Sequence, residues 1–247
     1  MEDTVGRFAE MIRESDNIAF FGGAGVSTES GIPDFRSAKG IYSQRWKRDI
    51  PPEEIISHTF YEYHPEEFWE FYKEKLLFPE AEPNDCHKAL AKLEKMGKVR
   101  AVVTQNIDGL HQKAGSKTVH ELHGSVLRNY CTGCRRFYSL EDILAMPGVP
   151  VCPHCHKPIK PDVVLYEESL DQDVMDRAVK AIRKADMLII GGTSLVVYPA
   201  AGLIHYYRGD KLVLINKTAT SADAYASLSI HEPIGEVFRK VMEALEV

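Results

Sequence analysis

Four short apolar runs, separated by segments with helical periodicity, constrain the fold of this chain more than any other feature. They are Ile18–Phe21, Val99–Val103, Met187–Ile190 and Lys211–Ile215. Between and around them, apolar residues fall on one helix face, as in Val5, Phe8, Ala9 and Ile12, or Val174, Ala178, Ala181 and Ile182, or Val237, Phe238, Val241 and Leu245. Strands that are apolar on both faces belong to parallel sheets covered by helices on both sides. We therefore predict an α/β fold with a doubly wound, mainly parallel sheet, and ligands at the carboxyl ends of its strands.

Two segments depart from this alternation. Residues 37–80 are rich in charged and aromatic residues, with a helix that opens at Pro65, and residues 125–160 contain two cysteine pairs and little apolar periodicity. We predict that both are insertions that together form a smaller lobe. The predicted division is a sheet domain of residues 1–36, 81–124 and 161–247, and a small lobe made of a helical insertion, 37–80, and a zinc-ribbon module, 125–160.

The two cysteine pairs predict a metal site. Cys131-Thr-Gly-Cys134 and Cys152-Pro-His-Cys155 are C-x2-C knuckles separated by 17 residues. Two such knuckles complete a tetrahedral site of four thiolates, which is typical of zinc. Four thiolates leave no open position for water, so we expect one structural zinc ion rather than a catalytic one. His154 and His156 are alternative ligands, but we interpret them as loop residues that face solvent.

Composition excludes several classes of protein. Acidic residues outnumber basic ones 36 to 30, which argues against nucleic-acid binding by the whole surface, and residues 128–160 carry only a mild basic excess. The stretch 187–207 has no charged side chain, yet Gly191-Gly192-Thr193-Ser194 and Pro199 divide it into a strand, a turn and a helix start, so we predict buried core rather than a membrane span. With no signal peptide visible and few cysteines, we expect a cytoplasmic protein. We also expect a monomer.

A glycine-rich turn follows the first apolar run. Gly22-Gly23-Ala24-Gly25 lets a backbone approach a phosphate, and the amides at the next helix start would hold the anion. Thr28 stands where the dehydrogenase fingerprint requires a third glycine, which disfavours an ordinary dehydrogenase, and a purely structural turn is the other alternative. Asp34, Phe35 and Arg36 follow shortly, and Arg36 could pair with a phosphate.

Polar residues also follow the other strands. Thr104-Gln-Asn-Ile-Asp108 suits hydrogen bonding to a polar ligand, although Asp108 alone is equally explained as a helix cap. His123 beside Gly124 has a pKa suited to proton transfer near neutrality. Gly192-Thr193-Ser194 and Asn216-Lys217 supply hydroxyl and amide groups for phosphates or sugars.

Together these residues resemble the sirtuins, in order and over nearly the whole chain. The matching blocks are Gly23–Arg36, Thr104–Asp108, His123-Gly124, the paired cysteines and Gly192–Pro199. The resemblance implies a Rossmann-like NAD-binding domain and an NAD-dependent protein-lysine deacetylase. NAD is then a co-substrate: nicotinamide leaves, and the acyl group is transferred from lysine to give 2′-O-acetyl-ADP-ribose. The sequence favours a compact bacterial-type catalytic core.

Site residues follow from the resemblance, residue by residue. It implies His123 as general base on the ribose hydroxyls, Asn106 as the residue that orients the ribose, and Asp34 as a partner of Arg36 or of a water molecule. The implied NAD contacts are Ala24, Thr28, Phe35, Arg36, Gln105, Ile107, Asp108, His123, Thr193, Ser194, Asn216 and Ile234. The implied contacts to the acyl-lysine peptide are Val163, Val164, Leu165 and Tyr166, in a strand that docks the substrate.

The chain departs from the family pattern in that docking segment. Where sirtuins commonly show Phe-Gly-Glu, it has Tyr166-Glu167-Glu168. Glu167 either favours basic residues beside the target lysine or points to solvent. Sirtuins that prefer succinyl or malonyl groups carry Tyr-x-x-Arg in the helical insertion, and the nearest match here is Tyr72-Lys-Glu-Lys75, so we expect acetyl to be preferred.

Two further functions compete with deacetylation. A protein ADP-ribosyltransferase would use the same NAD cleavage, but a base for the ribose hydroxyl is needed only for deacylation, so His123 favours the latter. A zinc-ribbon module for nucleic acid is disfavoured by the weak basic excess.

Overall fold

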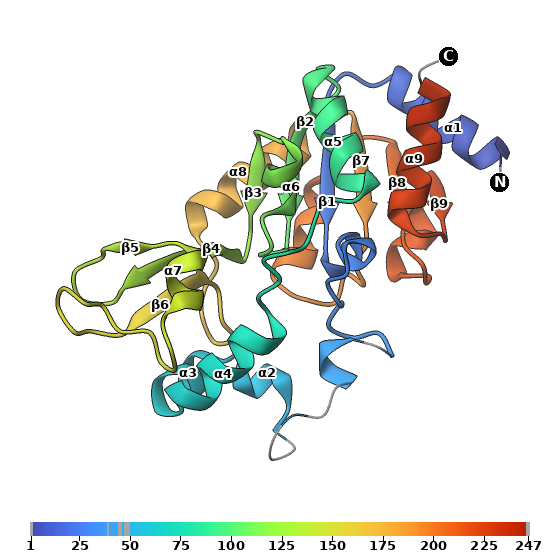
Figure 1. Ribbon diagram of the computed structural model, residues 1–247. Coiled ribbons are helices and arrows are strands. Elements are labelled where there is room, and N and C mark those ends of the chain that lie inside the picture. Colours follow the sequence, from blue (N-terminus) through green and yellow to red (C-terminus); the bar gives the residue numbers. More distant parts are fainter. Residues whose placement is uncertain (1, 39, 44–45, 47–49, 246–247) are drawn as a thin grey trace.

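The computed structural model describes residues 2–38, 40–43, 46 and 50–245. Positions 1, 39, 44–45, 47–49 and 246–247 of the predicted domain ranges lie outside these described residues. The chain forms a larger lobe around a parallel sheet and a smaller lobe of short helices and antiparallel strands (Figure 1). In the part of the chain that is described, no helix has both the length and the apolar character needed to cross a bilayer.

The larger lobe has the predicted doubly wound topology. Six of the described strands form a parallel sheet in the order β3-β2-β1-β7-β8-β9. Their bounds are β1 Ile18–Gly22, β2 Val99–Thr104, β3 Val119–Glu121, β7 Met187–Gly191, β8 Lys211–Ile215 and β9 Leu228–Ile230. The chain starts in the middle at β1, winds outward to β3, and returns to the other side of β1 at β7. The strand order therefore reverses between β1 and β7, which is where a sheet of this kind opens a ligand crevice.

Helices cover both faces of the sheet, as the alternation along β1 requires. Ile18 and Phe20 pack against α1 (Glu2–Arg13), α5 (Asp85–Lys95) and α9 (Ile234–Leu245). Ala19 and Phe21 pack on the opposite face against α8 (Gln172–Lys184) and the 3₁₀ helix η5 (Ala200–Tyr206). α6 (Leu110–Ala114) follows β2, and η6 (Ser221–Tyr225) lies between β8 and β9.

The smaller lobe has its own apolar core, to which both insertions contribute. The helical insertion forms η3 (Ile41–Ser43), α2 (Pro52–Ile55), α3 (His58–Tyr63) and α4 (Pro65–Lys75). The cysteine-bearing segment forms α7 (Leu140–Ala145) and an antiparallel sheet of described strands in the order β5 (Phe137–Tyr138), β4 (Gly124–Cys131), β6 (Ile159–Val163). Trp69 and Tyr72 of α4 share one buried cluster with Cys131 and Cys152. The domain limits themselves stay a prediction.

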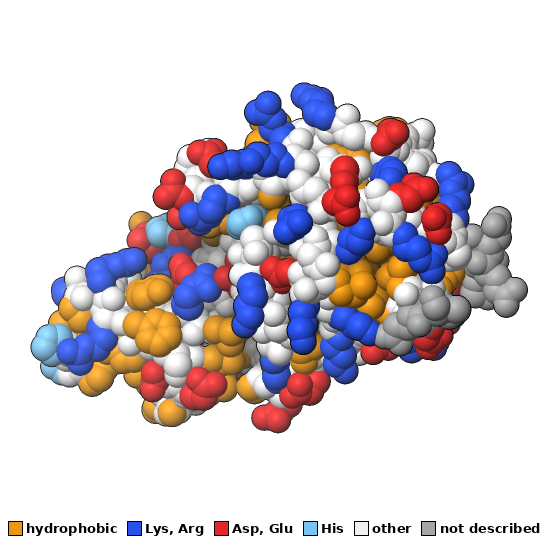
Figure 2. Space-filling model, turned by 90° about the horizontal axis from the view of Figure 1, so that it is seen from above, with side chains coloured by type: hydrophobic (Ala, Val, Ile, Leu, Met, Phe, Trp, Pro, Cys, Tyr) orange, Lys and Arg blue, Asp and Glu red, His pale blue; other side chains and the backbone are white. Residues whose placement is uncertain are grey.

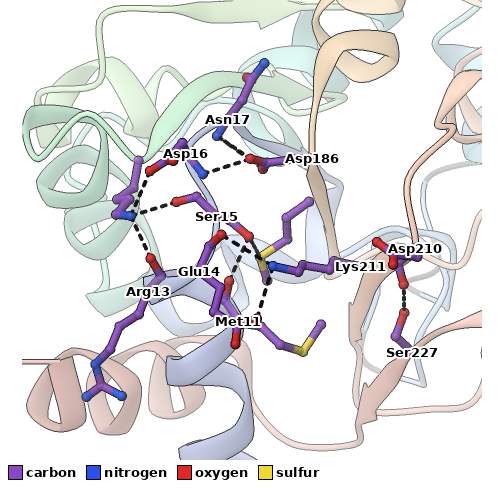
Figure 3. A network of polar contacts seen from close by, with 12 residues as sticks. Met11, Arg13, Glu14, Ser15, Asp16, Asn17, Asp186, Asp210, Lys211 and Ser227 are labelled. Carbon is purple, nitrogen blue, oxygen red and sulfur yellow. Dashed lines mark hydrogen bonds and ion pairs between the residues drawn. The ribbon is translucent and has the colours of Figure 1, made fainter.

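A polar clasp joins the chain at the amino ends of the strands (Figure 3). In a parallel sheet these ends lie opposite the carboxyl ends, which the glycine turns follow. Lys98, just before β2, donates its three ammonium protons to the carbonyls of Arg13 and Ser15, each at 2.8 Å, and to the carboxylate of Asp16 at 3.1 Å. The Asp186 carboxylate, just before β7, accepts from the backbone amides of Asp16 at 2.8 Å and Asn17 at 3.1 Å. The clasp therefore ties the starts of β1, β2 and β7 together.

Candidate active site

A cavity of about 1080 Å³ lies at the carboxyl ends of the sheet strands and extends to the small lobe. It gathers every residue that the sequence predicts to contact NAD or the peptide. These residues are Ala24, Thr28, Phe35, Arg36, Gln105, Asn106, Ile107, Asp108, His123, Val163, Val164, Leu165, Tyr166, Thr193, Ser194, Asn216 and Ile234. Segments far apart in the sequence thus meet where the strand order reverses.

Two glycine turns touch backbone to backbone at the base of the cavity. The Gly25 amide donates to the Gly192 carbonyl at 2.8 Å. A Cβ added at Gly25 would lie 2.8 Å from the Gly192 Cα. Gly192 has a φ of +58°, and a Cβ added there would lie 2.3 Å from the Val26 nitrogen. Only glycine fits at both positions. The turn leads into two short 3₁₀ segments, η1 (Ala24–Val26) and η2 (Thr28–Ser30), which form the helix start predicted after the glycines.

His123 is held by one ring nitrogen. Its Nδ1 lies 2.9 Å from the carbonyl oxygen of Gln105, and because a carbonyl only accepts, Nδ1 must carry the proton. Nε2 is then the nitrogen with the lone pair. Burial lowers the pKa of His123, against the smaller opposing effect of the Gln105 bond, so the ring is neutral at pH 7. The arrangement makes His123 suitable as a general base.

Gly124 and Gln105 fix the place of this histidine. Gly124 has a φ of +75°, and a Cβ there would begin 1.9 Å from the Asp162 carbonyl oxygen, which explains why glycine follows the histidine. The Gln105 side chain donates to Thr193 Oγ1 at 3.2 Å and so joins the end of β2 to the turn after β7.

Ser27 joins the polar residues after β2 to the glycine turn. Its hydroxyl donates to Asp108 Oδ2 at 2.6 Å and accepts from Asn106 Nδ2 at 3.0 Å. Asp108 Oδ1 also accepts from the Leu110 amide at 2.9 Å, so Asp108 both lines the cavity and caps the chain before α6. Burial raises the pKa of Asp108. Ser27 is 1% exposed and was not among the predicted site residues, although it lies inside the first matching block.

The segment after the glycine turn is organised by Asp34 and Tyr42. Asp34 Oδ1 accepts from the backbone amides of Arg36 at 3.0 Å and Ser37 at 2.7 Å, so it orients Arg36 through the main chain. The Arg36 guanidinium lies 5.2 Å from the centre of the Tyr42 ring, a cation–π contact. Phe35 meets the same ring edge-on at 5.5 Å.

Two predicted NAD contacts lie at the far end of the sheet. Asn216, after β8, donates its side-chain amide to the Thr218 carbonyl at 2.7 Å, which leaves the amide oxygen for a ligand hydroxyl. Ile234 is buried at the start of α9, and a side chain on Gly191 would meet its Cδ1 at 2.3 Å. The glycine turn also reaches α9, because Glu29 accepts from the Gly235 amide at 2.7 Å.

The predicted docking strand over residues 163–168 is only partly correct. β6 ends at Val163, and regular pairing then gives way to an isolated parallel bridge between Tyr166 and Ser57. The Val164 amide donates to the His123 carbonyl at 3.0 Å, so the segment runs directly beside the candidate base. Main-chain bonds of the segment are thus directed at the protein itself on this side.

The structure gives Glu167 a partner that the sequence did not reveal. Its Oε2 accepts from the amide of Thr59 at 2.8 Å and from the hydroxyl of Thr59 at 2.7 Å, while the residue is exposed and lines the cavity. A preference for basic residues beside the target lysine stays a prediction. The hydroxyl bond from Thr59 lowers the pKa of Glu167. Its φ of +76° places it in the left-handed region that glycine favours.

Four cysteines form the candidate metal centre. All four sulfur atoms lie within 4.8 Å of one another, with Cys131 and Cys155 3.2 Å apart and Cys134 and Cys152 3.7 Å apart. A tetrahedral zinc with bonds of 2.3 Å places its sulfur ligands about 3.8 Å apart, so the tetrad fits the ion. Within the described residues, none of the four lines the cavity, which agrees with a structural role.

Two smaller expectations concern the side chains near these sites. His154 and His156 are exposed and lie outside the cysteine cluster, as predicted. Tyr72 is fully buried in the small-lobe core, while the Lys75 ammonium pairs with Glu74 at 3.0 Å, and neither lines the cavity. The nearest match to a carboxylate-binding pair is therefore turned away from the site.

Comparisons with known proteins agree with this geometry. The Sir2 family model matches residues 23–199. An NAD-dependent protein deacetylase of Clostridium perfringens is 61% identical over 98% of this chain and all of the relative, and one of Clostridium acetobutylicum is 54% identical over 97% and 98%. The solved structure of a Sir2 with a p53 peptide and NAD+ is 43% identical, with a TM-score of 0.84 and 96% coverage of both chains. A Sir2 bound to acetylated peptide is 40% identical, with a TM-score of 0.83 and the same coverage. The chain belongs to the Sir2 family.

Proposed function

We propose that this protein is an NAD-dependent protein-lysine deacetylase, which releases nicotinamide and transfers the acetyl group of acetyl-lysine to ADP-ribose. One observation carries the proposal: a neutral histidine, fixed through Nδ1, shares a single cavity with the glycine turn and the predicted peptide segment. The names of the relatives and of the Sir2 complexes support it. The co-substrate supplies the ribose carbon and hydroxyls to which the acetyl group is transferred.

The chain's own residues then do the following work. His123 Nε2 takes a proton from a ribose hydroxyl, because Nδ1 is occupied by Gln105. Asn106 orients the ribose, and its own amide is held by Ser27. Asp108 and Ile107 bind the nicotinamide carboxamide, and Phe35 covers the reacting carbon and excludes water.

The remaining contacts bind the rest of NAD. The backbone of the glycine turn approaches the phosphates, since Gly23, Ala24 and Gly25 line the cavity. The other proposed contacts to phosphates, riboses and adenine are Ala24, Thr28, Arg36, Gln105, Thr193, Ser194, Asn216 and Ile234. Zinc, held by the four cysteines, stabilises the small lobe and takes no part in the chemistry.

The substrate is an acyl-lysine peptide or protein that lies along residues 163–166. Because Tyr72 and Lys75 are turned away from the cavity, no arginine-like group from this pair meets a charged acyl chain, and the neutral acetyl group is preferred. On the face drawn in Figure 2, Lys and Arg side chains are interspersed with Asp and Glu, which gives no support to a nucleic-acid partner. Cysteines that must stay reduced to hold zinc support a cytoplasmic location. A monomer stays a prediction, which light scattering can check.

Mass spectrometry of an acetyl-lysine peptide incubated with the enzyme tests the proposal. With NAD, we expect deacetylated peptide together with nicotinamide and acetyl-ADP-ribose, and without NAD no reaction. Loss of the acetyl group in NAD-free buffer would contradict the proposal. Transfer of ADP-ribose to protein with the acetyl group retained would instead support the ADP-ribosyltransferase alternative.

A further inference from the structure

Two tyrosine hydroxyls meet between the segment that follows the glycine turn and the segment that docks the peptide. Tyr42 Oη and Tyr166 Oη lie 2.8 Å apart, within hydrogen-bond distance. Both side chains line the cavity. We propose that Tyr166 is a positioning residue that couples acyl-peptide docking to NAD affinity through its hydroxyl bond to Tyr42. This inference rests on the proposed function and adds a regulatory link within the same site.

At the Tyr166 end of the contact, hydrogen bonds hold the main chain. Its amide donates to the Ile56 carbonyl at 3.1 Å, and its carbonyl accepts from the His58 amide at 3.0 Å. The next residue, Glu167, is held by Thr59. A peptide that binds along residues 163–166 therefore contacts a segment whose main chain is held against the helical insertion. The Tyr166 side chain is still 37% exposed, so the peptide can order its ring.

The Tyr42 end of the contact reaches two predicted NAD contacts. The Tyr42 amide donates to the Phe35 carbonyl at 2.9 Å, and its ring packs edge-on against Phe35 and carries the Arg36 guanidinium 5.2 Å from its centre. Burial raises the pKa of Tyr42, and the Tyr166 bond raises it further, so the phenol stays neutral and able to donate. Fixing the Tyr42 hydroxyl thus limits the positions that Phe35 and Arg36 can adopt.

The Tyr42–Tyr166 hydrogen bond explains how a bound peptide would increase the affinity for NAD. A peptide that orders Tyr166 also orders Tyr42, so less conformational freedom is left to lose when NAD binds. The same coupling must act in reverse, so NAD strengthens peptide binding by an equal factor. Phenylalanine, which stands at this position in the common family pattern, has no hydroxyl and could not make the contact.

Replacing either tyrosine by phenylalanine removes one hydroxyl with little change in packing, and so tests the coupling between peptide and NAD binding. Tyr166→Phe and Tyr42→Phe should each raise the KM for NAD at saturating peptide by about two- to tenfold, the value of one neutral hydrogen bond. The kcat should change much less, because neither hydroxyl is proposed to touch the reacting atoms. The double variant should raise the KM for NAD no further than the single variant with the larger effect, since both substitutions remove the same hydrogen bond.

A matched control and a binding measurement separate coupling from stability. Tyr61→Phe deletes a hydroxyl that donates to the Ile159 carbonyl at 3.3 Å elsewhere in the small lobe, and it should leave the KM for NAD unchanged whatever it does to the melting temperature. Calorimetry with ADP-ribose, in the presence and absence of an acetyl-lysine peptide, measures the coupling factor directly. That factor should shrink towards one in Tyr166→Phe.

An unchanged KM for NAD in Tyr166→Phe, or effects that simply add in the double variant, would overturn the inference. An equal rise in KM in Tyr61→Phe would do the same, because it would point to general loosening of the lobe. If the wild-type protein turns over no acetyl-lysine peptide, the proposed function is wrong, and the ADP-ribose measurement still decides whether Tyr166 couples the two segments.

Discussion

At the scale of single residues, the site depends on side chains whose polar atoms form hydrogen bonds within the protein before any ligand binds. His123 has one ring nitrogen tied to Gln105, and Ser27 is shared between Asp108 and Asn106. These hydrogen bonds fix tautomers and rotamers, so the side chains of the site need little reorganisation during the reaction.

The first prediction concerns the pH dependence of His123. Burial lowers its pKa below the ordinary 6.5, so in the folded protein the base stays neutral to more acid pH than an exposed histidine would. The acid limb of kcat/KM for an acetyl-lysine peptide should therefore fall below pH 6.5, with activity lost as pH drops through the lowered pKa. His123→Ala should abolish turnover at every pH while the protein stays folded by circular dichroism. Retained turnover would exclude His123 as the base.

The second prediction concerns Ser27. Ser27→Ala removes the hydroxyl that holds both Asp108 and Asn106, and leaves a buried carboxylate with one partner fewer. A hydrogen bond to a charged group contributes about 1.5–3 kcal/mol, so we expect kcat/KM to fall about ten- to a hundredfold. Ser30→Ala is the matched control, because Ser30 accepts from Asn84 but does not line the cavity. Equal kinetics for the two variants would contradict the role given to Ser27.

The candidate site could be predicted from the sequence where residue types follow buried strands in a recognisable order. The predicted NAD contacts and His123 do meet in one cavity, because parallel strands bring their carboxyl ends to one edge. Ser27 and Tyr42 were missed, since a serine inside a turn and a tyrosine in an insertion carry no signal until their partners are placed. The partner of Glu167 could not be predicted for the same reason, since Thr59 lies 108 positions away in the sequence.

At the scale of elements, the long apolar strands were predictable and the short ones were not. β1, β2, β7 and β8 match the predicted runs to within a residue at either end. β3 and β9, at the two edges of the sheet, have three residues each and no continuous apolar run, so periodicity could not reveal them. The predicted helix start after Pro199 became the 3₁₀ helix η5, because periodicity does not distinguish so short a helix from an α-helix.

The third prediction belongs to the clasp at the amino ends of the strands. Lys98→Met keeps the aliphatic stem but removes the ammonium that binds the carbonyls of Arg13 and Ser15. We expect the free energy of unfolding to fall by about 1–3 kcal/mol, measured by urea denaturation, because two carbonyls lose a charged partner. The KM values for NAD and peptide should not change, since the clasp lies away from the cavity. Lys95→Met, on the exposed side of α5, should leave stability nearly unchanged.

At the scale of the whole molecule, the two lobes have separate apolar cores. The sheet domain buries one cluster on each face of its sheet, whereas both insertions share a third cluster in the small lobe. The two tryptophans of the chain, Trp46 and Trp69, both pack in or against this third cluster, so intrinsic fluorescence reports on the small lobe. Lys73 of α4 also bonds the carbonyls of Met146 and Gly148, and so joins one insertion to the other.

The fourth prediction uses this optical signal. Removal of zinc by a chelator, or Cys152→Ser, should expose Trp69 and shift its emission to longer wavelength, because Cys152 and Trp69 belong to one core. Activity should be lost together with the small lobe, while far-ultraviolet circular dichroism retains most of its signal from the sheet domain. Normal fluorescence, melting and activity after verified zinc removal would contradict a structural metal.

The clasp of Lys98 and Asp186 has a consequence for engineering. It stabilises the sheet at the end opposite the cavity. Cavity residues that determine selectivity for the acyl group can therefore be randomised without changing the contacts that join the amino ends of the strands. Most members of such a library should still fold, since the usual conflict between a new activity and a stable scaffold is eased when the two depend on different ends of the same strands.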